Sequence, residues 1–69
     1  MSIAKIGEIV GTSDRGWEDA AQIAVNEAVK TIRGIHEIEI VDQTAHVDPN
    51  TGKITQYRTG IKFSFSVES

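Results

Sequence analysis

The strongest constraint on the fold is the alternation of apolar and polar side chains from Ile54 to Val67. Successive side chains of a strand point to opposite faces of a sheet, so the pattern predicts one long strand with an apolar face and a polar face. The apolar face is predicted to hold Tyr57, Thr59, Ile61, Phe63, Phe65 and Val67, and the polar face Gln56, Arg58, Gly60, Lys62, Ser64 and Ser66. Such a strand needs partner strands along its edges.

Two further segments supply those partners. Residues 35–47 alternate Ile38 and Ile40 with Glu37 and Glu39, which predicts a second strand. The turn residues 48–52, which include Pro49 and end at Gly52, a glycine free to adopt a left-handed conformation, connect it to residues 54–67 as a hairpin. Residues 3–10 form a short apolar run that predicts a first strand, ended by Gly11.

Between the first two strands the spacing predicts one amphipathic helix over residues 14–33, ended by Gly34, which suits a left-handed conformation after the helix. Thr12 or Ser13 is expected to cap its start. One half of the helical wheel holds Trp17, Ala20, Ala21, Ala24, Val25, Ala28, Val29 and Ile32. Trp17 is therefore expected in the core or at a subunit contact, while Ile23 falls in the polar half and would be buried only by self-association.

The order of elements is therefore β-α-β-β, an α+β fold. The economical arrangement is a three-stranded antiparallel sheet in the order 1-3-2, packed on the one helix. One helix covers one face only. The other face is expected to expose a polar band made of Glu37, Glu39, Gln43, Gln56, Arg58 and Lys62.

Length and composition limit the remaining choices. We expect the 69 residues to form a single domain (residues 1–69), which buries only about 60% of its unfolded surface. Cysteine is absent, so disulfides and thiolate metal sites are excluded, and self-association is the expected source of extra stability. A net charge of −3 without a basic stripe disfavours nucleic acid, and the absence of a signal peptide or membrane span predicts a cytoplasmic protein.

Catalysis has little support in the sequence. Without cysteine, and without Ser, His and carboxylate residues in a recognisable motif, no nucleophile is evident, so we expect no enzyme. A metal role is open. Glu37, Glu39 or Asp42 from several subunits would offer oxygen ligands to Ca²⁺ or Mg²⁺ near a symmetry axis. In the simpler alternative these carboxylates pair with Arg58, Lys62 or Lys53 between strands.

Four stretches of the chain resemble the dodecins, small flavin-binding proteins built as β-α-β-β protomers that assemble into hollow dodecamers. They are EIVGTS (8–13), WEDAAQIAVNEAVKTIRG (17–34), EIEIVDQ (37–43) and QYRTGIKFSFSV (56–67), which together cover nearly the whole chain. The resemblance implies the fold and a homododecamer.

The resemblance also implies where a ligand would bind. In flavin-binding dodecins a Trp early in the second strand stacks on the flavin ring and a Gln in the third strand bonds the ring edge. Those positions fall on Glu37 and Arg58, whereas Asp42, which reaches the ribityl chain in part of the family, is retained. A carboxylate offers no stacking surface, so the pattern indicates a branch without the usual flavin contacts.

Two functions follow as expectations. The first is a homo-oligomeric protein that binds and stores a small ligand, with riboflavin or FMN implied by the resemblance. The alternative is a non-flavin structural shell that binds cations (Ca²⁺ or Mg²⁺) or an anionic ligand through Glu37 and Arg58.

Overall fold

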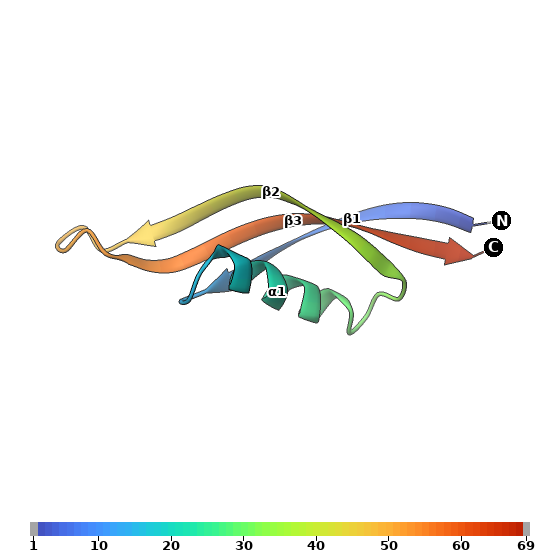
Figure 1. Cartoon of the computed structure of the whole chain (residues 1–69), viewed down its shortest axis with the longest axis horizontal. Coiled ribbons are helices and arrows are strands. Elements are labelled where there is room, and N and C mark those ends of the chain that lie inside the picture. The colour runs from blue at the N-terminus through green and yellow to red at the C-terminus, as the bar shows by residue number, and fades with distance from the viewer. Residues whose placement is uncertain (1, 69) are drawn as a thin grey trace.

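A computed structural model describes residues 2–68 and has the predicted order of elements (Figure 1). Its elements are β1 (Ser2–Ser13), α1 (Trp17–Ala28), β2 (Ile35–Val47) and β3 (Ile54–Glu68). The first strand is longer than predicted, because it continues past Gly11 to pair with β3. Within residues 2–68, no helix is both long and apolar enough to cross a membrane.

The sheet has the order β1-β3-β2, and both outer strands are antiparallel to β3. The predicted α+β fold and strand order are therefore confirmed. β1 ends where Ser13 pairs with Tyr57, so β2 and β3 continue beyond it as a two-stranded ribbon. Figure 1 shows this ribbon, residues 46–56, projecting past the start of α1 along the 55 Å axis of the molecule. We call it the arm.

The start of the helix differs from the prediction. α1 begins at Trp17, with Gly16 as an N-cap residue that has no side-chain bond, so the predicted capping by Thr12 or Ser13 is wrong. Ser13 instead stabilises the turn between β1 and α1. Its Oγ accepts a hydrogen bond from the Arg15 amide at 2.9 Å and donates one to the Asp19 carboxylate at 2.6 Å. Residues 14–16 turn the chain from the end of β1 into α1, which packs on the sheet.

The helix also ends earlier than predicted, at Ala28 rather than Arg33. Residues 29–33 form the connection that leads to β2, and Gly34 has the expected left-handed conformation with φ 80°. The Ser66 amide donates a hydrogen bond to the Gly34 carbonyl, so the end of β3 anchors this connection. Because Val29 lies past the helix, it is 52% exposed and does not join the core.

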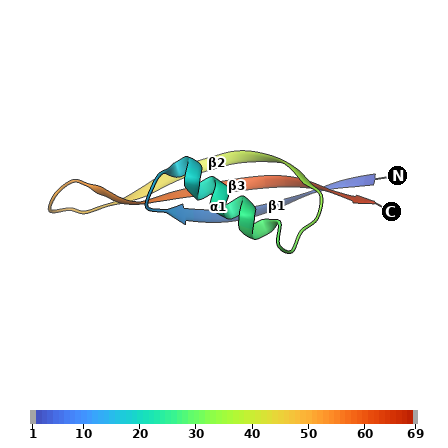
Figure 2. The same ribbon diagram turned by 60° about the horizontal axis from the view of Figure 1, so that its bottom comes forward.

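The core lies between α1 and the two strands β1 and β3 (Figure 2). It is built from small helix residues, Ala20, Ala21, Ala24 and Ala28, packed over the apolar side chains of β3. Ile61 and Phe63 are buried there, as the alternation of the third strand predicts. The helix packs mainly over β1 and β3, so Ile38 and Ile40 on the same side of the sheet stay 39% and 48% exposed.

Trp17 fixes the start of the helix to the sheet. Its indole Nε1 donates to the Thr44 carbonyl at 2.8 Å, and its ring meets Tyr57 edge-on with centroids 4.8 Å apart. The buried Thr59 hydroxyl donates to the Trp17 carbonyl at 2.8 Å. Trp17 therefore packs within its own chain, whereas Ile23 is 43% exposed, as its place on the wheel predicts. A subunit contact at either residue stays a prediction.

Candidate ligand-binding site

The sheet presents its polar side chains on the face turned away from α1, which we call the outer face. The pairing of the strands arranges this face in rows, each with one residue from β1, β3 and β2. The rows are Ile6–Ser64–Glu37, Glu8–Lys62–Glu39, Val10–Gly60–Asp42 and Thr12–Arg58–Thr44. The predicted site residues Glu37, Glu39, Asp42 and Arg58 therefore share one face.

A β-bulge at Val41 brings Asp42 onto this face. The register of β2 shifts between Ile40, which pairs with Ile61, and Asp42, which pairs with Gly60. A bulge inserts one residue into the strand and reverses the alternation beyond it. Without it, Asp42 would face the helix side. For the same reason Gln43 pairs with Thr59 and lies on the helix side, so its predicted place in the outer polar band is wrong.

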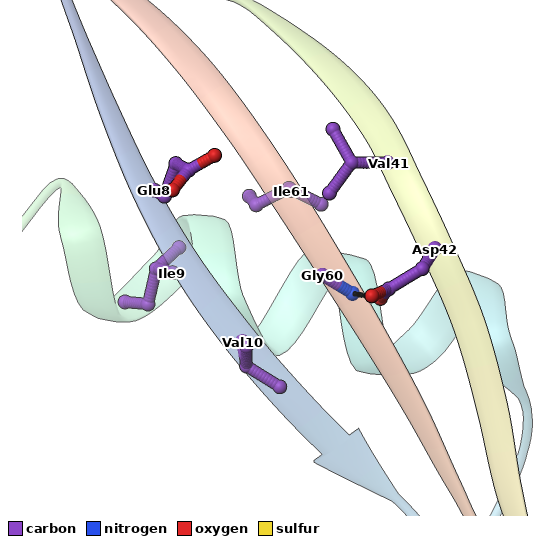
Figure 3. Close-up of a pocket in the computed structure, with 7 residues that line it drawn as sticks. All are labelled: Glu8, Ile9, Val10, Val41, Asp42, Gly60 and Ile61. Atoms are coloured by element: carbon purple, nitrogen blue, oxygen red, sulfur yellow. Dashed lines mark hydrogen bonds between the residues drawn. The ribbon is translucent and has the colours of Figure 1, made fainter.

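The carboxylate of Asp42 replaces a backbone partner at the bulge. Its Oδ1 accepts a hydrogen bond from the Gly60 amide at 3.2 Å, so this N–H is satisfied although the regular ladder is interrupted (Figure 3). A Cβ on residue 60 would lie 2.6 Å from Asp42 Oδ1 and 3.4 Å from a Val41 methyl group. Glycine is thus required for this close approach.

These residues line a shallow pocket of about 280 Å³. Figure 3 shows Glu8 and Val10 reaching it from β1, Val41 and Asp42 from β2, and the helix behind the strands. The walls combine two carboxylates with two half-exposed valine side chains. The pocket is open to solvent on the outer face. It therefore offers both an apolar surface and negative charge to a ligand.

Few of the charged side chains on the outer face form ion pairs with one another. Lys62 Nζ lies 3.9 Å from Glu8 Oε1, and both side chains are about half exposed or more, so this pair contributes little to stability. Among the side chains that the structure describes, those of residues 4–67, the other ion pair joins Lys30 to Glu27 on the helix. The predicted pairing of Glu37, Glu39 and Asp42 with Arg58, Lys62 or Lys53 is therefore not made within one chain.

Glu37 and Arg58 are also too far apart to act together in one chain. Glu37 pairs with Ser64, which is six positions along β3 from Arg58. At about 3.3 Å per residue this is roughly 20 Å. Arg58 is instead in the row next to Asp42. A contact between Glu37 and Arg58 would have to join different chains.

A single chain also lacks a complete metal site. In the part of the chain whose side chains are described, residues 4–67, no group of three or more His, Asp or Glu side chains is placed to hold a metal ion. The carboxylates of Glu37, Glu39 and Asp42 instead occupy successive rows along one strand. The predicted convergence of these ligands needs several subunits and stays a prediction.

The aromatic side chains all lie on the helix side. Trp17 packs on Tyr57, and Phe63 packs on Phe65 with centroids 5.9 Å apart. These four residues are the complete aromatic content of the chain. The outer face consequently has no Trp, Tyr or Phe ring on which a ligand could stack.

No sequence pattern predicted a site role for Glu8, Val10, Val41 or Gly60. Of these residues, Gly60 is the one that the sequence could have indicated, because a glycine inside a strand often marks a bulge or a close backbone approach. Glu8 and Val10 had no signal of their own, because their place opposite Lys62 and Gly60 depends on the register of a strand that pairs from the other end of the chain.

Comparison with known proteins gives consistent matches over nearly the whole chain. The family model Dodecin matches residues 3–68. A calcium dodecin from Mycobacterium tuberculosis is 39% identical over 67 residues, which cover 97% of this chain and 92% of that protein.

Solved structures agree with these matches. A mutant of the dodecin from T. thermophilus has 28% identity and a TM-score of 0.90, with both chains covered completely. The crystal structure of a calcium-chelating immunodominant antigen, calcium dodecin, from M. tuberculosis has 35% identity and a TM-score of 0.80, covering 96% of this chain and 91% of that one. That structure is described as having a novel calcium-binding site.

Proposed function

Because the chain belongs to the dodecin family, we propose that it is a homo-oligomeric protein that binds and stores a small ligand. The observation that supports this function is the pocket around Asp42, where one carboxylate oxygen is held by the Gly60 amide and the other is free for a ligand. We further propose a homododecamer. Its mass would be about 90 kDa, twelve times the 7.5 kDa of one chain.

The pocket of one chain is half of a site. Its volume of about 280 Å³ is below the roughly 300–1,000 Å³ of pockets that enclose small molecules. A second outer face placed over it would exclude water and add a second set of carboxylates. Ligand binding and self-assembly are therefore linked in this proposal.

A divalent cation is the ligand that the side chains of the outer face fit best. Ca²⁺ takes six to eight oxygen ligands, and Glu8, Glu39 and Asp42 supply oxygen donors in two neighbouring rows. One chain has too few, so copies must contribute together. The 39% identity with a protein described as a calcium dodecin supports this choice of ion.

A flavin is the second candidate, and the specific observation in its favour is Asp42. In this proposal the Asp42 oxygen that does not bind the Gly60 amide accepts a hydrogen bond from a hydroxylated chain such as ribityl. The flavin ring would have fewer suitable contacts. Trp17 lies on the opposite side of the sheet, so stacking would depend on the Arg58 guanidinium, which lies in the row next to Asp42.

Two titrations of the assembled protein test these candidates. We expect Ca²⁺ to give saturable heat in calorimetry, and riboflavin and FMN to give weak fluorescence quenching or none. Strong quenching near one flavin per chain, without heat from Ca²⁺, would reverse the order of the candidates. Saturation by neither ligand would remove the proposed binding function.

The variant Asp42→Asn separates the roles of charge and hydrogen bonding. Asparagine keeps an oxygen that accepts from the Gly60 amide but removes the negative charge. We expect this variant to lose Ca²⁺ binding while its melting temperature stays close to that of the wild type. Glu27→Gln is the matched control, since it removes an exposed carboxylate from the helix and should leave binding unchanged.

Other expectations remain predictions. They are that the protein is not an enzyme, that it is cytoplasmic, and that its partners are copies of itself and a small molecule rather than nucleic acid or membrane.

A further inference from the structure

A groove runs between α1 and β2 on the helix side of the sheet. Its volume is about 460 Å³, and its floor is made by Ala21 and Val25 of the helix and Ile38 and Ile40 of the strand. The helix packs over β1 and β3 and leaves these two isoleucines 39% and 48% exposed. The apolar face of β2 therefore lacks a cover within its own chain.

The arm, residues 46–56, also has apolar side chains that its own chain does not cover. It extends beyond β1 and beyond the helix, so neither of its faces is covered (Figure 1). Val47 and Ile54 pair across it and are 53% and 43% exposed. A two-stranded ribbon alone is marginally stable in water, so these residues gain most from contact with another surface.

A further strand paired along the edge of β2 would cover neither the apolar face of β2 nor the arm. Three register irregularities interrupt this strand, at 35/37, 40/42 and 46/47, and the Thr44 carbonyl already accepts the Trp17 indole. Bulges and an occupied carbonyl are devices that prevent an edge from adding a further strand. A partner must therefore reach the apolar face of β2 rather than its edge.

We propose that the arm of one chain docks in the α1–β2 groove of the next copy. The apolar pair Val47 and Ile54 would cover Ile38 and Ile40. Charge supports the match, because Glu18 lines the groove and Lys53 lies at the end of the arm beside Ile54. The inference rests on the self-assembly in the proposed function and adds the surfaces that perform it.

This contact joins different patches on the two chains. Such a head-to-tail contact closes into a ring when the rotation between copies allows it, and every arm and every groove is then occupied. Each contact would bury apolar surface from four exposed aliphatic side chains. It also leaves the outer face free, so the ligand pocket and the docking groove lie on opposite sides of the sheet.

Disulfide trapping tests the proposal, since the chain has no native cysteine. In the double variant Ile40→Cys, Val47→Cys the two positions lie seven residues apart on one strand, about 23 Å. A disulfide needs Cα atoms within about 7 Å, so the two cannot join within one chain. Mild oxidation is expected to give a ladder of linked chains on a denaturing gel, ending at the size of the ring.

The single variants Ile40→Cys and Val47→Cys are the matched controls, and each should remain mostly monomeric on the same gel. Dimers from either single variant, or no ladder from the double variant, would overturn the docking. A charge reversal gives a second measurement. Light scattering should show a lower assembly mass for Glu18→Lys and for Lys53→Glu, and the mass should return when both changes are in one chain.

The wild-type mass separates this inference from the proposed function. A mass near that of one chain would overturn self-assembly and the docking with it. A large wild-type mass with no ladder, and with Val47→Glu as fully assembled as the wild type, would overturn the docking alone. The groove would then be open to another occupant, such as a small apolar molecule.

Discussion

Replacing Gly11 with alanine should destabilise the protein more than any other single methyl group added to β1. The new Cβ would lie 2.0 Å from the Ala20 carbonyl oxygen and 3.0 Å from the Ala24 Cβ. Ordinary contacts begin at 3.4 Å, so the helix must retreat from β1 by more than 1 Å. The obstructing atom belongs to the helix backbone and cannot rotate away. Overpacking of this kind costs about 1–3 kcal/mol.

Thermal unfolding followed by circular dichroism measures this cost. For a domain of this size each kcal/mol lowers the melting temperature by about 4–8 °C, so a loss of about 2 kcal/mol predicts a fall of about 8–16 °C. All samples must have the same protein concentration, because assembly makes the melting temperature depend on it.

Gly16→Ala is the matched control. Nothing lies within 4 Å of its added Cβ, and its φ of 165° is extended backbone that alanine adopts. Alanine is a poorer N-cap residue than glycine, so a small loss below about 1 kcal/mol is expected. Equal falls in the two variants, or a Gly11→Ala protein that melts within about 2 °C of the wild type, would refute the proposed close packing of α1 on β1.

Three further changes test the core, the site and the helix anchor. Ile61→Ala should lower the free energy of unfolding by about 2–5 kcal/mol in denaturant titrations, because Ile61 is 1% exposed. Gly60→Ala should displace the Asp42 side chain, which lies 2.6 Å from the added Cβ, and weaken Ca²⁺ binding in calorimetry while stability changes by only about 1 kcal/mol. Trp17→Phe removes the indole donor to Thr44 and should lower the free energy of unfolding by about 0.5–1.5 kcal/mol.

Most of the fold followed from patterns that act locally. The alternation from Ile54 to Val67 predicted which side chains of β3 reach the core, and Ile61 and Phe63 are buried accordingly. Gly34 and Gly52 were expected to be left-handed, and their φ values are 80° and 77°. These features depend on backbone sterics and side-chain spacing, both of which are visible in the order of residues.

The limits of the helix were less accurate for a physical reason. The wheel pattern continued to Arg33, but the chain leaves the helix after Ala28 in order to reach β2. Helix propensity over residues 29–33 is a weak preference, whereas entry into the sheet is fixed by many backbone hydrogen bonds. Tertiary contacts therefore set the end of the helix.

The site residues show most clearly which features follow from local patterns and which depend on tertiary contacts. Local patterns were enough to place the predicted site residues Glu37, Glu39, Asp42 and Arg58 on strands. Length and the absence of cysteine were enough to indicate that the chain cannot bury all its apolar surface alone. The pairing of β2 with β3, which no local pattern shows, places Asp42 on the face of the glutamates and Gln43 on the opposite face. The reason is the bulge at Val41, since one unpaired residue reverses the alternation beyond it and depends on the partner strand rather than on the residues of β2 themselves.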